Sequence, residues 1–126
     1  MALGKLAIHV SDTNGSWGLH TLTQDQLDWN PEMKNEDPAT KAELLAKFDK
    51  ESGELKAALA AMTPERWDSH WKFVASGQTW IDDTKYRVWR TWVMNHLVHH
   101  RGQLSVYLRL LEKKVPGMYG PSADEM

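Results

Sequence analysis

Apolar side chains recur every three or four residues in three parts of the chain, which is the spacing of helices that bury one face. The first part covers residues 3–11, the second runs from about residue 40 to residue 62, and the third runs from about residue 83 to residue 114. Asp, Asn, Gly and Ser lie together in residues 12–16, so we expect the first helix to stop or bend there.

The second and third helices carry recognisable end signals. Asp37 directly before Pro38 is a good start for the second helix, and Thr40 with Glu43 three residues later is an alternative capping box. Pro64 is suited to the first position of a short helical turn that follows. Pro116 and the glycine after it end the third helix.

The remaining segments are less regular. Residues 21–29 are ambiguous, with a short helical turn as one interpretation, and residues 30–38 contain two prolines and predict a loop. Residues 70–83 predict an extended excursion or a small hairpin that bends at Gly77. We therefore expect one domain over residues 1–126, all-α in class, built as an up-down helix bundle with a short non-helical excursion before the last long helix.

Composition and charge narrow the function classes. The 126 residues are 41% hydrophobic and 25% charged, as in an ordinary globular domain. There is no cysteine, so a disulfide, a thiolate metal site and a cysteine nucleophile are excluded, and a reducing cytoplasm is expected. The formal charge of -2 and the absence of a basic run longer than two residues disfavour nucleic-acid binding. No segment predicts a membrane span.

Histidines on the last helix are the strongest candidates for chemistry. His96 and His100 are four residues apart, so their rings lie about 40° apart on the helix and can converge on one metal ion. On spacing alone, an alternative is a pair of partly buried histidines that bind carbonyl groups or water. At about 100° per residue, the same face also carries large or polar residues that are candidates for a pocket, namely Trp89, Trp92, Gln103 and Tyr107.

A third histidine lies on the first helix. His9 flanks the apolar stripe that includes Leu6, so antiparallel packing of the first and last helices would bring three imidazoles together. A three-histidine site leaves coordination positions open, which is typical of catalytic metal centres. Asp12 lies one turn after His9 and is a candidate hydrogen-bond acceptor that supports it.

Two segments of the chain resemble the DinB (damage-inducible) family. Residues 96–109 contain its HxxxHRGQ element, and residues 115–125 are similar to its proline-containing tail that ends in YGPSADE. Residues 3–10 are similar to its LGxLAxH element, while the middle of the chain matches only in layout. By this resemblance the family's metal-binding triad falls on His9, His96 and His100.

The resemblance implies a metal-binding four-helix bundle that is usually homodimeric and holds a divalent ion such as nickel or zinc. The family pattern normally has a further helix before the LGxLAxH element, and that helix is missing from the pattern of this chain. Either the chain is a shortened version, or a partner chain covers the exposed face. The second option predicts an obligate oligomer, and as partner we expect a second copy, in a homodimer or a higher homo-oligomer.

Relatives in the wider superfamily include thiol-dependent S-transferases, a mycothiol-dependent maleylpyruvate isomerase and metal-dependent hydrolases. We therefore expect a metal-dependent enzyme of this kind with a small-molecule substrate, a tryptophan-lined pocket and, as a further cofactor, a low-molecular-weight thiol. In this interpretation Gln103 orients a ligand or a metal-bound water. One alternative is a metal-binding stress-related or structural protein without turnover, and another is a packing module whose site is vestigial.

Overall fold

The computed structural model of the chain describes residues 2–32 and 37–126, apart from the side chain of Asn14. Its first helical rod is continuous and consists of α1 (Leu3–Asp12), the π-helical segment η1 (Thr13–Trp17) and α2 (Gly18–Thr23). The expected stop at residues 12–16 is therefore wrong. Gly15 instead allows a close approach, because a Cβ atom on it would lie 2.6 Å from the Cβ of Glu51 on the neighbouring helix.

The second rod is α3 (Lys41–Ala60), and its capping box is confirmed. The Thr40 side chain accepts a hydrogen bond from the Glu43 backbone N–H, and the Glu43 carboxylate accepts one from the Thr40 N–H. A short helix, α4 (Pro64–Asp68), follows with proline at its start, as predicted.

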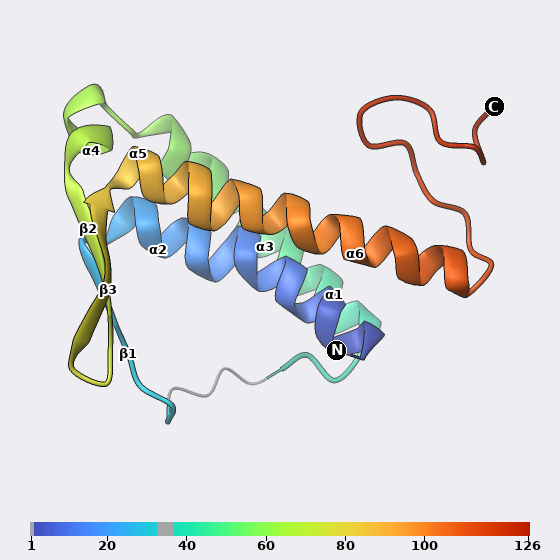
Figure 1. Cartoon of the computed structure of the whole chain (residues 1–126), viewed down its shortest axis with the longest axis horizontal. Coiled ribbons are helices and arrows are strands. Elements are labelled where there is room, and N and C mark those ends of the chain that lie inside the picture. Colours follow the sequence, from blue (N-terminus) through green and yellow to red (C-terminus); the bar gives the residue numbers. More distant parts are fainter. Residues whose placement is uncertain (1, 33–36) are drawn as a thin grey trace.

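The third rod runs antiparallel to the first along most of its length (Figure 1). It consists of α5 (Lys85–Val88), a second π-helical segment, η2 (Trp89–Asn95), and α6 (His96–Leu110). Thr84 caps it by accepting a hydrogen bond from the Arg87 backbone N–H. The rod ends four residues before the predicted end at residue 114.

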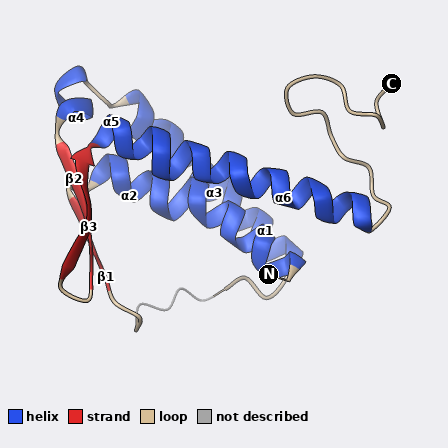
Figure 2. Ribbon diagram, in the orientation of Figure 1, coloured by secondary structure: helices blue, strands red, loops and turns tan. Residues whose placement is uncertain are grey.

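Three strands form a small mixed sheet at one end of the rods (Figure 2). The hairpin expected in residues 70–83 is present as β2 (His70–Ala75) and β3 (Gln78–Thr84), and Gly77 at its bend has a positive φ of 74°. The third strand, β1 (Gln26–Trp29), pairs in parallel with β2.

The expected all-α bundle is therefore wrong. The part of the chain that the structure describes has three helical rods and a three-stranded sheet, not four bundled helices. The reason lies in residues 26–29, whose four-residue strand is too short to show a clear alternation of apolar and polar positions. Its partner is about 45 residues further along the chain, so pairing with β2 is a tertiary interaction that local pattern does not encode.

The core lies where the sheet meets the rods. Trp71 is fully buried and contacts Ile81 and Val88, while Trp17 and Phe73 pack around this cluster. The core therefore joins β2 and β3 to both the first and the third rod.

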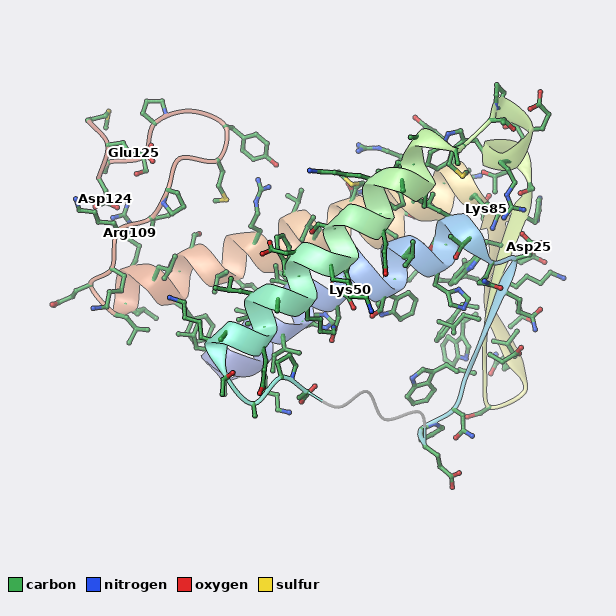
Figure 3. The ribbon with its side chains drawn as sticks, turned by 180° about the vertical axis from the view of Figure 1, so that it is seen from behind. Asp25, Lys50, Lys85, Arg109, Asp124 and Glu125 are labelled. Atoms are coloured by element: carbon green, nitrogen blue, oxygen red, sulfur yellow. The ribbon has the colours of Figure 1, made fainter. Side chains whose placement is uncertain are left out.

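A buried lysine holds the first and third rods together at the same end. The Lys85 ammonium donates to the carbonyl oxygens of Thr21, at 2.9 Å, and of Gln24, and forms an ion pair with Asp25. These carbonyls lie at the C-terminal end of α2, where a helix has unpaired acceptors and favours a positive charge. Figure 3 shows Lys85 and Asp25 together at this end.

The last residues fold back beside the end of α6. The Asp124 carboxylate accepts hydrogen bonds from Arg109, at 2.5 Å, and from the Val115 backbone N–H, at 2.8 Å (Figure 3). The Glu125 carboxylate binds the backbone N–H groups of Gly117 and Ser122. No described helix is both long and apolar enough to cross a membrane.

Candidate metal centre

Three histidine rings meet between the first and third rods. The Nε2 atom of His9, on α1, lies 3.0 Å from Nε2 of His96 and 3.1 Å from Nε2 of His100, both on α6. The Nε2 atoms of His96 and His100 are 2.7 Å apart. The antiparallel packing of the first and third rods (Figure 1) therefore brings the three rings together, and within the described residues they form a group able to hold a metal ion.

The helix pair supplies this geometry through its packing. Leu6, one turn before His9 on α1, is almost fully buried, and it lies in the seam between α1 and α6. His96 and His100 stand one turn apart on one face of α6. Because each ring comes from a helix that packs against the other, the three nitrogens are held by rigid backbone rather than by loops.

Gln103 determines which nitrogen of His100 carries the proton. Its amide oxygen lies 2.7 Å from Nδ1 of His100. An amide oxygen only accepts hydrogen bonds, so Nδ1 must be the donor. The neutral His100 ring then presents an unprotonated Nε2, with its lone pair directed at the other two rings.

Burial favours the neutral form of the other two rings. Burial lowers the pKa of His9 below its ordinary value, and the nearby His100 lowers it further, while Asp12 acts in the opposite direction. The pKa of His96 is also lowered, first by burial and then by His100, His9 and His99. A neutral imidazole is the form that binds a metal ion, so this environment suits ligation.

A model of one protein family matches the chain over residues 1–126, and it describes the DinB family. The chain belongs to the DinB family. The family model therefore confirms the resemblance seen in residues 96–109 and in the tail, and extends it to the whole chain. Comparisons with curated proteins and with solved structures find no match.

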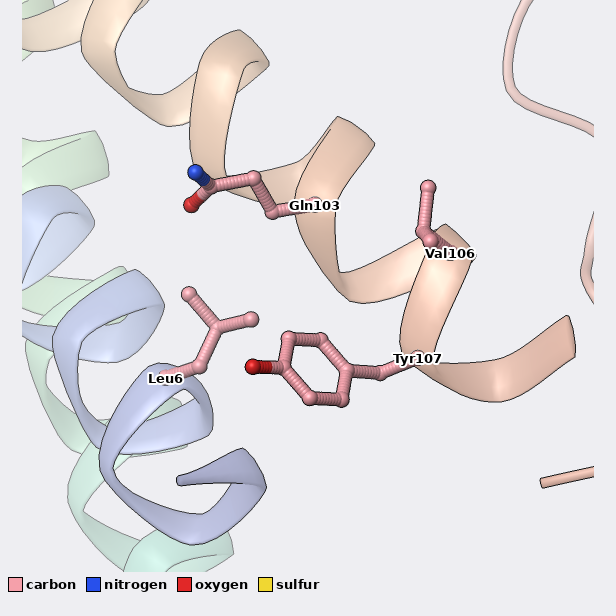
Figure 4. Close-up of a pocket in the computed structure, with 4 residues that line it drawn as sticks. All are labelled: Leu6, Gln103, Val106 and Tyr107. Carbon is pink, nitrogen blue, oxygen red and sulfur yellow. The ribbon is translucent and has the colours of Figure 1, made fainter. Parts of the chain in front are cut away.

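Two of the predicted pocket residues line a cavity beside the triad of this DinB-family protein. Gln103 and Tyr107, on α6, enclose about 210 Å³ together with Leu6 and Val106. Figure 4 shows the Tyr107 hydroxyl directed toward Leu6, across the space between α6 and α1. A second hollow of about 370 Å³ borders His9 and is lined mainly by charged and polar residues, Lys5, Asp12 and Asp37 among them.

Asp12 lies near His9, as expected, but its carboxylate is paired with another residue. Its carboxylate pairs with the Lys47 ammonium of α3, which also contacts Glu51 at 3.3 Å. Asp12 therefore links the first and second rods. Among the described contacts it forms no hydrogen bond with the His9 ring, and it raises the pKa of His9 through its charge.

The two predicted tryptophans point in different directions. Trp89 packs against Trp67, with ring centroids 6.1 Å apart, and lies beside Gly18. Trp92 lines a separate cavity of about 160 Å³. Both lie in η2, whose wider i→i+5 turn advances fewer degrees per residue than an α-helix, so an α-helical wheel misplaces Trp89 relative to His96.

The sequence reasoning missed most residues of that separate cavity. Its other lining residues come from η1 and from the hairpin, and they are Trp17, Phe73, Trp80 and Ile81. The only available signal was the count of seven tryptophans. A helical wheel drawn for one helix does not bring together residues from three different elements.

Proposed function

We propose that this DinB-family protein is a metal-dependent enzyme of the thiol S-transferase or hydrolase type, with one divalent ion, nickel or zinc, held by His9, His96 and His100. The observation that carries the proposal is the mutual approach of three Nε2 atoms, all within 3.1 Å. One of them, Nε2 of His100, is an unprotonated acceptor, because the proton of this neutral ring is on Nδ1, which donates a hydrogen bond to the Gln103 amide oxygen.

The distances fit ligands of one ion. Nitrogen ligands at about 2.0–2.1 Å from an ion are roughly 2.9–3.4 Å apart for angles between a right angle and a tetrahedral one. The separations of 2.7–3.1 Å between the three nitrogens lie close to this range. Hydrogen bonds alone explain the cluster poorly. Each Nε2 atom offers either one N–H or one lone pair, so three Nε2 atoms in mutual contact cannot all be paired with one another as donor and acceptor.

The surrounding residues have separate tasks in this proposal. Gln103 holds the His100 ring in one orientation and one tautomer. The cavity lined by Leu6, Gln103, Val106 and Tyr107 offers room for a small molecule beside the rings. When bound, the ion supplies a Lewis acid that makes a water or a thiol nucleophilic near neutral pH. The chain has no cysteine, so a reacting thiol would come from a low-molecular-weight cofactor.

Metal analysis and turnover test the proposal separately. We expect the purified protein to bind one Ni²⁺ or Zn²⁺ ion per chain and the His96→Ala variant to lose that ion. Low-molecular-weight thiols with electrophiles, and ester or amide substrates, should then be converted by the wild-type protein only. A metal-loaded protein without turnover on either class would favour the alternative, a metal-binding stress-related or structural protein. Turnover that survives loss of the ion would refute the mechanism.

We also propose a homo-oligomer, most simply a homodimer, in the cytoplasm. α6 exposes apolar side chains along its length, with Val106 57% and Leu110 75% exposed. Apolar side chains gathered on one helix are more often covered by a partner than left in water. Size-exclusion chromatography with light scattering checks the state, and a stable monomer at micromolar concentration would contradict it.

A further inference from the structure

A small cavity with aromatic walls lies between the hairpin and the two π-helical segments. It is lined by Trp17 of η1, Trp92 of η2, and the hairpin residues Phe73, Trp80 and Ile81. We refer to these five residues as the aromatic pocket. No charged side chain lines it, so its walls favour a neutral, apolar guest.

The size of the aromatic pocket indicates what fits. Its volume is about 160 Å³. An apolar cavity of about 150 Å³ accommodates one benzene molecule, so a single six-membered ring is a matching guest. Trp80 is 66% exposed and Trp92 is 51% exposed. Large indole surfaces left in water are unfavourable, and a ring placed between them would remove part of that surface from water.

The aromatic pocket lies one to two helical turns from the histidine triad along the two rods. Trp92 precedes His96 by one turn on the same rod, which corresponds to roughly 6 Å along the axis. On the opposite rod, Trp17 follows His9 by eight residues. Four of those steps are π-helical at about 80° each, so Trp17 returns to the face of His9, whereas a regular α-helix would place it about 80° away.

We propose that the aromatic pocket binds a single neutral six-membered ring of a small-molecule substrate whose polar end reaches the histidine triad. The contact between the polar end and the triad rests on the proposed function, whereas binding of the ring in the aromatic pocket needs no metal. Trp92 and Trp80 hold the ring from two elements, and the polar end extends about one helical turn along the rod from Trp92 toward His96.

Ring binding is tested first on the metal-free protein with toluene as the probe. The seven indole N–H groups give separate signals in ¹H–¹⁵N correlation spectra, assigned with single Trp→Phe variants. We expect toluene to shift the signals of Trp17, Trp80 and Trp92 and to leave that of Trp29 unchanged. Trp92→Ala should weaken toluene binding at least fivefold, and Trp29→Ala, a surface control outside the pocket, should not change it.

The link to the triad is tested on the nickel-loaded protein with two hydroxamates. Acetohydroxamate carries the metal-binding group alone, and 3-phenylpropanohydroxamate adds a ring on a two-carbon spacer. We expect the phenyl compound to bind at least tenfold more tightly, and Trp92→Ala to remove this difference without changing the affinity for acetohydroxamate.

The outcomes separate the two proposals. If the protein takes up no nickel, the proposed function fails while the toluene spectra still decide on the aromatic pocket. Shifts caused by tetramethylammonium but not by toluene would overturn the neutral-ring assignment. A dimer that protects Trp80 and Trp92 and excludes toluene would overturn it as well, because the occupant would then be a second copy. Equal affinities for the two hydroxamates would overturn the link to the triad.

Discussion

The hydrogen bond from His100 to Gln103 gives the sharpest test of the metal centre. Gln103→Leu removes the acceptor for Nδ1 of His100 but keeps a side chain of similar size. The His100 ring is then free to rotate or to move its proton to Nε2, where it would block ligation. We therefore expect the variant to fold normally and to bind Ni²⁺ or Zn²⁺ more weakly than the wild-type protein.

The magnitude follows from the surroundings of this bond. Losing a hydrogen-bond partner behind a metal-bound histidine lowers affinity by about 10–100-fold, or about 1.4–2.8 kcal/mol. The bond is short, at 2.7 Å, but Gln103 is exposed, so water can replace the lost acceptor. We therefore expect a loss near tenfold. Gln103→Glu keeps an acceptor and adds a negative charge, so its affinity should equal or exceed that of the wild-type protein.

Isothermal titration with Ni²⁺ and Zn²⁺ at pH 7.5 measures these affinities, and circular dichroism checks folding. Gln78→Leu is the matched control, because Gln78 is an exposed glutamine of β3 and lies outside the metal centre. An affinity of Gln103→Leu within twofold of the wild-type value would refute the reasoning. So would an equal loss in Gln103→Glu, since that variant retains the acceptor.

Three further predictions concern stability. Lys85→Met should lower the free energy of unfolding by about 1–3 kcal/mol in urea titrations, because the Thr21 carbonyl at the end of α2 loses its donor. Gly15→Ala should cost about 1–3 kcal/mol, since the new Cβ would press on Glu51. The metal-free protein should lose stability as pH falls below 6.5, the ordinary value from which the pKa of His9 and His96 is lowered. The unfolded chain then takes up protons first, and flat stability from pH 7 to pH 5 would contradict this.

Much of the helical framework follows from local signals. The Thr40–Glu43 capping box, Pro64 at the start of α4 and Gly77 in the hairpin each act within a few residues, so sequence is sufficient to find them. Periodicity alone places only His96 and His100 on one face. The meeting of His9 with this pair also depends on antiparallel packing of the two helices, and the triad as a set was implied by the resemblance to the DinB family.

Two features that the sequence did not predict, strand β1 and the contacts of Lys85, depend on residues far apart in the chain. β1 is four residues long and acquires its identity from β2, across a connection that contains α3. The Lys85 contacts behave in the same way, since a lysine at the start of a helix is ordinarily exposed. Here its ammonium closes the end of α2, which lies about 60 residues earlier in the chain. Neither feature has a periodic signature.

The two π-helical segments explain why the tryptophans were placed wrongly by the α-helical wheel, and both lie beside the histidine-bearing helices. One lies directly after the rod segment with His9 and the other directly before the segment with His96, and η1 contacts η2. Each changes the rotation per residue from about 100° to about 80°, which turns Trp89 away from the triad and turns Trp17 toward it. Such segments are frequently found at functional sites. In the proposed arrangement, Trp17 of η1 and Trp92 of η2 line the aromatic pocket on the rods that carry His9 and His96, so one ligand with a ring and a polar end would contact both places.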